Sequence, residues 1–117
     1  MSRRTERLND LLREEISQVL HHQVRDPRLG GLLSITHVDV SPDMRYARVF
    51  VSILGSDEEK DKALQGLRRA EGFFRRELAH ELNLRRTPLL SFHRDDSIEE
   101  AARVLELMGK VEEGDAP

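Results

Sequence analysis

The stretch that decides the fold is ALQGLRRAEGFFRRELAHELNL, residues 63 to 84. At about 100° of rotation per residue, its apolar positions predict an amphipathic helix with one face against a core. That face comprises Ala63, Leu64, Leu67, Ala70, Phe74, Leu78 and Leu82. The opposite face carries Lys62, Gln65, Arg69, Gly72, Arg76, His80 and Asn83, with no carboxylate among them. The stretch therefore predicts a long core helix whose outer face is cationic and is interrupted by a glycine.

Gly72 in the middle of this helix has two interpretations. A helical glycine costs roughly 1 kcal/mol relative to alanine, so it is expected where a bend or the close approach of another backbone requires the missing side chain. It is also tolerated in an ordinary solvated helix. The sequence leaves both interpretations open.

Length and composition predict one domain with an aliphatic core. The chain has 117 residues, of which 38% are apolar and 35% charged, and it has no tryptophan. The absence of cysteine excludes disulfides, thiolate zinc sites and cysteine nucleophiles, and is consistent with a reducing cytosol. No apolar run approaches the roughly 18 residues of a membrane span, and MSRRTERLND lacks the apolar region of a signal peptide. We expect a soluble, untargeted protein with no membrane partner.

The net charge of −3 conceals an uneven distribution. From Asp95 to Pro117 eight acidic residues oppose two basic ones, so this end carries −6 and residues 1 to 94 carry +3. A mildly basic body with an acidic end permits a polyanionic partner, which the overall charge alone would not suggest.

The N-terminal half predicts one helix and two strands. The helix is expected over residues 4 to 24, with Asp26-Pro27 ending it and Gly30-Gly31 allowing a turn. Its core face would comprise Leu8, Leu11, Leu12, Ile16, Val19 and Leu20. Strands are expected over residues 33 to 41 and 46 to 54, because both segments are rich in β-branched residues and a Ser-Pro-Asp turn separates them.

Alternation assigns the faces of these two strands. The second strand would place Ala47, Val49 and Val51 on its apolar face. The first would place Thr36, Val38 and Val40 on one face, and Ile35, His37 and Asp39 on the other. His37 and Asp39 suggest acid/base chemistry, but no nucleophile or partnered base accompanies them, so we interpret them as part of a partly exposed sheet face.

The C-terminal half predicts two helices around a short strand. Ser56 and Glu59 form a capping-box pattern that begins the long helix, and the pattern Ser97 to Glu100 begins the last one. Residues 89 to 94 are expected to form a third strand. Ile98, Ala101, Ala102, Leu105 and Met108 would make the last helix amphipathic, and Gly109 with residues 111 to 117 is expected to form a frayed acidic tail.

This order predicts an α+β fold. The strand–helix–strand crossover between the second and third strands indicates a three-stranded mixed sheet with helices on one face. Motifs for catalysis are missing: the five histidines include no HExxH, and the sequence contains neither GxxxxGK[ST], GxGxxG nor GxSxG. We expect no enzyme, no cofactor and no metal site.

The remaining signal is positive charge beside Gly72. Arg68, Arg69, Arg75 and Arg76 flank it in two adjacent pairs, and Arg85 and Arg86 follow the helix. Guanidinium groups suit phosphate because they present several donors in a planar fork and stay charged. Alternatively, these arginines form a solubilising face and pair with Glu71, Glu77 and Glu81 three or four residues away.

Several segments resemble the bacterial ribosome-binding factor A family, which has a type II KH domain. The matching residues are Arg4 with Leu8, Glu14-Glu15-Ile16, Asp26-Pro27-Arg28, the run Ile35 to Asp43 leading into Tyr46 to Val49, Leu82 to Pro88, Phe92, and Asp96-Ser97. In that family an Ala-x-Gly kink replaces the GxxG loop of other KH domains, and Ala70-Glu71-Gly72 matches that kink. The resemblance spans nearly the whole chain except the last helix and tail.

The resemblance implies a KH-like RNA-binding domain over residues 1–96, of the order helix-strand-strand-helix-kink-helix-strand, followed by a C-terminal helix and acidic tail over 97–117. It implies a monomeric, non-catalytic assembly factor that acts in the cytoplasm and binds free 30S subunits. This factor would contact 16S rRNA, assist late maturation and 5′-end processing, and be important for growth in the cold. The RNA contacts would map onto Ala70 to Gly72, flanked by Arg69, Arg75 and Arg76.

A second hypothesis needs no RNA. The basic helix face would then dock on an acidic protein partner, and the chain would be a protein-interaction module. Ribonuclease treatment of the complexes separates the two hypotheses.

Overall fold

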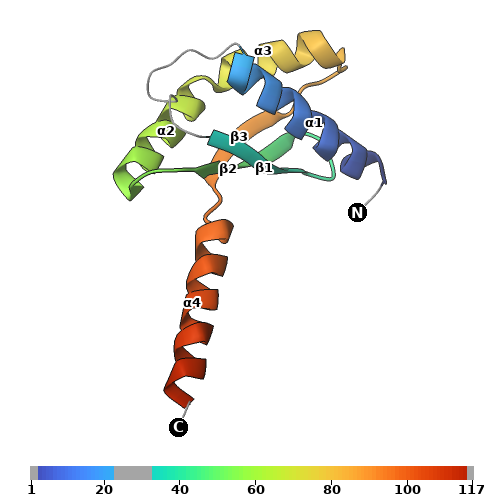
Figure 1. Ribbon diagram of the computed structural model, residues 1–117. Coiled ribbons are helices and arrows are strands. Elements are labelled where there is room, and N and C mark those ends of the chain that lie inside the picture. Colours follow the sequence, from blue (N-terminus) through green and yellow to red (C-terminus); the bar gives the residue numbers. More distant parts are fainter. Residues whose placement is uncertain (1–2, 23–32, 116–117) are drawn as a thin grey trace.

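The computed structural model describes residues 3–22 and 33–115 (Figure 1). The elements in chain order are α1 (Arg3–His22), β1 (Leu33–Val40), β2 (Tyr46–Ile53), α2 (Asp57–Arg69), α3 (Glu71–Leu82), β3 (Leu89–Arg94) and α4 (Ser97–Asp115). The predicted Asp26-Pro27 stop and Gly30-Gly31 turn lie outside the described residues. The predicted α+β element order is confirmed, including the two helices on either side of a kink that the family resemblance implied within residues 57 to 82.

The three strands form one mixed sheet in the order β1-β2-β3. β1 and β2 are antiparallel, whereas β2 and β3 are parallel and are joined through α2 and α3. Figure 1 shows α1, α2 and α3 together on one face of this sheet, as predicted. The other face is left without a helical layer from these three elements.

The core lies between this helical layer and the sheet. The largest side chains with almost no exposure include Leu12 and Ile16 of α1, Leu67 of α2, Phe74 and Leu78 of α3, and Phe92 of β3. Phe74 and Phe92 are in ring contact, with centroids 5.4 Å apart. Each fully buried side chain of this size stabilises the fold by about 1.5–3 kcal/mol. The core therefore fixes α3 directly against β3.

β1 contains a bulge that the sequence pattern did not predict. Ile35 pairs with Val51 and His37 pairs with Phe50, so Thr36 is an extra residue without a partner in the ladder. Its hydroxyl donates to the carboxylate of Asp95 at 2.5 Å. Because the bulge shifts the alternation, Ile35 and Val38 both face the core, and the predicted grouping of Ile35 with His37 and Asp39 was wrong.

The ends of the helices explain two further differences. Ser56 and Glu59 form the predicted capping box, with reciprocal side-chain and backbone bonds of 3.2 Å. Ser97, in contrast, is itself the first residue of α4, and its N–H donates to the Asp95 carboxylate at 3.0 Å. In the predicted capping box, the Ser97 N–H would have donated to the side chain of Glu100. In the structure it donates to the carboxylate of Asp95 instead.

α4 projects away from the body, on the side of the sheet opposite the other helices (Figure 1). Every residue from 101 to 110 is exposed, so its predicted apolar stripe covers no part of the core. The helix also continues through Gly109 to Asp115, and the prediction of a frayed tail from that point was wrong. Leu11 of α1 is 49% exposed, so its predicted place in the core was wrong.

None of the helices described here combines the length and the apolar character needed to traverse a lipid bilayer.

Candidate nucleic-acid interface

The junction of α2 and α3 is a sharp change of helix direction at Ala70. We call Arg69 to Gly72 the elbow. Ala70 has φ −86° and ψ 2°, and its N–H donates to the carbonyls of Gly66 and Leu67 at 3.1 Å each. Its own carbonyl accepts from Phe74 N–H at 3.0 Å. Ala70 thus ends one helix and begins the next, and Figure 1 shows the two helices running in different directions from it.

Both sides of the elbow are held by the core. Leu67 before it and Phe74 after it are each 0% exposed, and Ala70 is partly buried against the same cluster. A larger side chain at Ala70 would have to displace this packing. The position of the elbow relative to the sheet is therefore fixed by apolar contacts on both of its arms.

Gly72 does not make the bend. It lies in the first turn of α3, two residues after the break, and a Cβ built on it would have nothing within 4 Å among the residues that the structure describes. The interpretation that another backbone of this chain approaches Gly72 closely is therefore wrong for the described part. Open space at this glycine leaves the backbone of the first turn of α3 accessible from outside.

The N-terminus of α3 is an electropositive backbone end. Ala70 occupies its N-cap position and provides no side-chain cap. The first-turn amides of a helix have no intrahelical acceptors, and the helix dipole places partial positive charge there. Such ends bind phosphate oxygens when they are accessible. Here the end lies between the side chains of two arginine pairs.

Two of the predicted arginines have partners inside the protein. Arg68 Nη2 donates to the carbonyl of Phe92 in β3 at 3.1 Å. Arg75 Nε lies 2.6 Å from Glu71 Oε1, which also accepts from Leu90 N–H at 3.1 Å. Arg68 and Glu71 therefore attach the elbow to β3, and Arg75 is paired with Glu71 within α3. A contact of either arginine with RNA stays a prediction.

The other predicted arginines point into solvent without such partners. Arg69, Arg76, Arg85 and Arg86 are exposed and form no ion pair with any other described residue. Arg85 and Arg86 lie in the connection to β3, just after Asn83, whose φ of 49° ends α3 in the left-handed conformation. The elbow region thus offers four uncommitted guanidinium groups, two on its arms and two in the following loop.

The acidic groups of α2 are gathered at its other end. Arg94 of β3 pairs with Asp57 at 2.8 Å, and with Asp61 and Asp96 at 3.1 Å each. Hydrogen bonding and the charge of Arg94 hold the pKa of Asp57 below its usual range, and these carboxylates raise the pKa of Arg94. α2 therefore has an acidic end far from the elbow, where one guanidinium is shared by three carboxylates, and a cationic end at the elbow, which favours an anionic ligand there.

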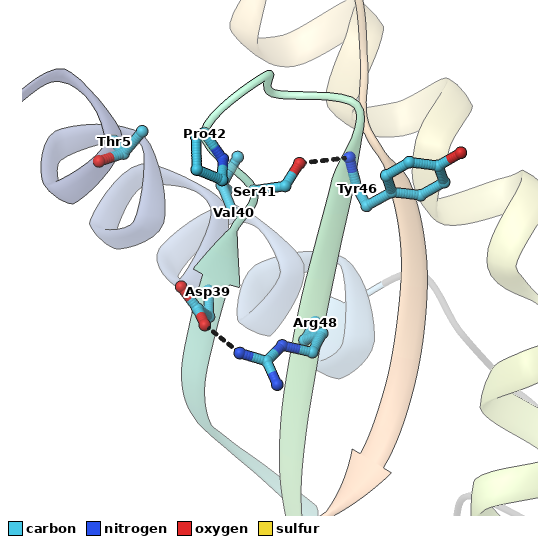
Figure 2. Close-up of a pocket in the computed structure, with 7 residues that line it drawn as sticks. All are labelled: Thr5, Asp39, Val40, Ser41, Pro42, Tyr46 and Arg48. Atoms are coloured by element: carbon cyan, nitrogen blue, oxygen red, sulfur yellow. Dashed lines mark hydrogen bonds and ion pairs between the residues drawn. The ribbon is translucent and has the colours of Figure 1, made fainter. Parts of the chain in front are cut away.

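A cavity of about 850 Å³ lies elsewhere, between the start of α1 and the β1–β2 hairpin (Figure 2). Its lining residues are Thr5, Asp39, Val40, Ser41, Pro42, Tyr46 and Arg48. The two oppositely charged groups, Asp39 and Arg48, form an ion pair with each other. The Ser41 hydroxyl of this lining donates to the Asp43 carboxylate. Because the lining supplies no uncommitted base to activate a hydroxyl, the cavity supports no catalytic assignment, and the elbow is the candidate site.

The sequence pattern assigned no role to a row of rings on the other side of the sheet. His37, Phe50 and His93 are neighbours across β1, β2 and β3. His37 was interpreted as part of an exposed sheet face, and it is exposed. The lateral alignment depends on the Thr36 bulge, so no pattern within one strand would have found it.

Comparisons with known proteins agree on one family. The family model described as "Ribosome-binding factor A" matches residues 4–108. Relatives of that name are 50% identical over 95% of this chain and 94% of the Dehalococcoides mccartyi protein, and 45% identical over 92% of this chain and 88% of the Acetivibrio thermocellus protein.

Solved structures show the same fold. The crystal structure of ribosome-binding factor A from Thermus thermophilus matches with a TM-score of 0.69 and 30% identity, over 77% of this chain and 93% of that one. A solution structure from Thermotoga maritima, described as a putative ribosome binding factor A, matches with a TM-score of 0.64 and 39% identity, over 79% and 91%. A further match, with a TM-score of 0.63 and 30% identity over 75% and 91%, is the Thermus thermophilus protein as fitted into the map of a complex with the 30S subunit.

Proposed function

Since the chain belongs to the ribosome-binding factor A family, we propose that it is a non-catalytic assembly factor that binds the free 30S ribosomal subunit. The fitted complex of the Thermus thermophilus relative with a 30S subunit supports this partner. The observation within this chain that carries the proposal is the elbow, where exposed Arg69 and Arg76 flank an uncapped helix N-terminus.

The proposed ligand at the elbow is the sugar-phosphate backbone of 16S rRNA. Arg69 and Arg76 would form charge-assisted bonds to phosphate oxygens, and Arg85 and Arg86 extend the same charge along the next loop. The open space beside Gly72 lets a phosphate reach the first-turn amides of α3. KH-type domains hold single strands by such backbone contacts.

The finer role that we propose is help in late maturation, including processing of the 16S rRNA 5′ end, in the cytoplasm. A monomer without catalytic activity can do this by binding one RNA arrangement more tightly than its competitors, which shifts the population toward that arrangement. Misfolded RNA arrangements rearrange more slowly at low temperature. The contribution is therefore expected to be largest during growth in the cold.

Charge reversal at the elbow tests the proposal. We expect Arg69→Glu combined with Arg76→Glu to weaken binding to purified 30S subunits, measured by cosedimentation at several salt concentrations. Loss of two phosphate contacts makes the plot of log K against log salt shallower by at least about 1.5. The matched control is Arg13→Glu with Arg45→Glu, which changes the net charge equally at exposed positions on α1 and the hairpin.

Two results would contradict the proposal. Equal affinity and equal salt slopes for the two double variants would show that the elbow is not the binding face. Complexes recovered from cells that survive ribonuclease intact would instead indicate docking of the basic face on an acidic protein partner.

A further inference from the structure

On the face of the sheet opposite α1, α2 and α3, three side-chain rings lie in contact with one another. We call this side of the sheet the open sheet face; its members are His37, Asp39, Tyr46, Arg48, Phe50, Ser52, Leu89, Ser91 and His93. Within it, the ring row consists of His37, Phe50 and His93, which occupy paired positions on three adjacent strands. The ring centroids lie 5.7 Å apart between His37 and Phe50, and 5.6 Å apart between Phe50 and His93.

The ring row is accessible. His37 is exposed, and Phe50 and His93 are only partly buried, whereas their strand neighbours Val49 and Val51 are 0% exposed. A single exposed ring is normal on a protein surface, but three in lateral register form a contiguous platform. The protein thus presents aromatic surface on the face that contributes nothing to its core.

Two guanidinium groups border the ring row: that of Arg48 is paired with Asp39 of the same face, and that of Arg68 donates to a backbone carbonyl and keeps its net charge. The Arg48 guanidinium carbon lies 5.8 Å from the Phe50 ring centroid, and the Arg48 side chain is 60% exposed. On the other side Arg68 reaches the Phe92 carbonyl in the edge strand. Burial lowers the pKa of His93, and the charges of Arg68 and Arg48 lower it further. The nearby carboxylates of Asp39 and Asp95 are engaged by Arg48 and by Thr36.

Arg68 also connects this surface to the elbow. It precedes Arg69 in the last turn of α2, yet its guanidinium group lies at β3. β3 pairs only with β2 in the described sheet, so it forms one edge. An RNA strand bound at the elbow could therefore continue past Arg68, around the β3 edge, onto the open sheet face.

We propose that the open sheet face is a second RNA-binding surface, on which unpaired bases stack against His37, Phe50 and His93. This inference rests on the proposed function and extends it from phosphate contacts at the elbow to base contacts on the sheet. Aromatic rings on adjacent strands of a sheet are an established platform for single-stranded bases, and cations beside them bind the backbone.

RNA fits this surface better than a protein partner does. Directly beside the ring row the outward positions are the small hydroxyl residues Ser52 and Ser91. The exposed apolar residues of this face, Tyr46 and Leu89, pair with each other four residues away, at the hairpin end, so they do not surround the row. Protein hot spots require a surrounding ring of contacts that exclude water. A base stacked on a side-chain ring keeps its polar edges in water, so it tolerates the hydroxyl-rich surroundings.

The test uses a tryptophan placed in the row. The chain has no tryptophan, so Phe50→Trp in the full-length protein gives a single emission signal at the centre of the platform. We expect saturable quenching by a mixed-sequence single-stranded RNA dodecamer. An abasic oligomer of the same length, which keeps the phosphates and lacks the bases, should quench far less at equal concentration.

A second variant measures the contribution of the ring. Phe50→Leu keeps apolar volume but removes the stacking surface, and should weaken dodecamer binding about tenfold. Gln18→Ala, at an exposed position of α1 on the other side of the sheet, should bind like the wild type. Circular dichroism of both variants verifies that the fold is retained.

The outcomes separate this inference from the function on which it rests. If the emission of the Phe50→Trp variant does not respond to RNA while 30S binding persists, the platform is wrong and the proposed function stands. If that emission responds to RNA but the wild type does not bind 30S subunits, the proposed function fails and the platform stands. Two results would overturn the proposed base-binding surface. One is equal quenching of the Phe50→Trp emission by the abasic oligomer, and the other is an emission change with ribosomal protein freed of RNA but none with RNA.

Discussion

Glu71 Oε1 lies 2.6 Å from Arg75 Nε, and the same oxygen accepts the N–H of Leu90 at 3.1 Å. A single carboxylate therefore joins the first turn of α3 to the beginning of β3 and neutralises one arginine of the elbow region. Because Glu71 both anchors the elbow and pairs with Arg75, the Arg75 guanidinium group is not available to bind phosphate.

Releasing Arg75 should strengthen RNA binding. Glu71→Gln keeps an oxygen for Leu90 N–H but removes the charge that holds Arg75. We expect tighter 30S binding and a salt slope steeper by up to about 1, measured by cosedimentation. Glu77→Gln is the matched control because it changes the net charge equally and forms no ion pair with another described residue. Equal effects of the two changes would argue against a specific release of Arg75.

The bulge residue Thr36 should contribute to stability through its hydroxyl. Thr36→Val keeps the shape but removes the donor to Asp95, and we expect about 1 kcal/mol lower free energy of unfolding at pH 7 in urea titrations. Thr36→Ser keeps a hydroxyl and should lose less. A Thr36→Val protein as stable as the wild type would contradict this role.

The same variant should change the acid limb of the stability curve. Hydrogen bonds from Ser97 and then Thr36 lower the pKa of Asp95 in the folded protein. The unfolded chain therefore binds the proton first, so this stabilisation is present above about pH 4 and is lost as pH falls through the folded-state pKa. In Thr36→Val the folded pKa rises toward its usual value. Unfolding free energy should then depend less on pH below about 4.

The contact between Phe74 and Phe92 should dominate the stability of the elbow. Phe74 is 0% exposed, and Phe74→Ala should cost about 3–5 kcal/mol of unfolding free energy because it removes a ring and leaves a cavity. Phe74→Leu should cost less because most of the volume remains. Urea titration followed by circular dichroism measures both. A small loss for Phe74→Ala would mean that the helices can close the cavity.

Removing α4 should leave the domain folded. We propose the boundary at residue 96, because every buried apolar residue of the described chain lies between Leu12 and Phe92. Deleting residues 97–117 breaks the Lys60–Glu99 ion pair of 3.0 Å but keeps Lys60 paired with Asp96. The thermal midpoint should fall by no more than about 5 °C. Loss of cooperative unfolding in the shortened chain would show that α4 belongs to the folding unit.

The elements of the fold could be predicted because their patterns are local. The apolar stripe of residues 63 to 84, the alternation of Ala47, Val49 and Val51, and the Ser56–Glu59 capping box each require only neighbouring residues. The break in the long helix was expected near Gly72, because glycine is the weak helix former there. It lies at Ala70, the first residue of the Ala70-Glu71-Gly72 kink that the family resemblance implied, where packing on the core sets the directions of both arms.

The amino-acid sequence by itself determined which segments are helical or extended, which faces of α2 and α3 are apolar, and that the arginines gather around their junction. The pairing of Arg75 with Glu71, four residues before it, was already among the sequence's alternatives. Only the tertiary structure decided that Arg68 is held at the Phe92 carbonyl and that Glu71 is itself anchored to β3 by Leu90 N–H. It also decided the Thr36 bulge and the alignment of His37, Phe50 and His93. The physical reason is that ion pairs, strand register and ring contacts form between residues distant in the chain, whose approach depends on how the whole core packs.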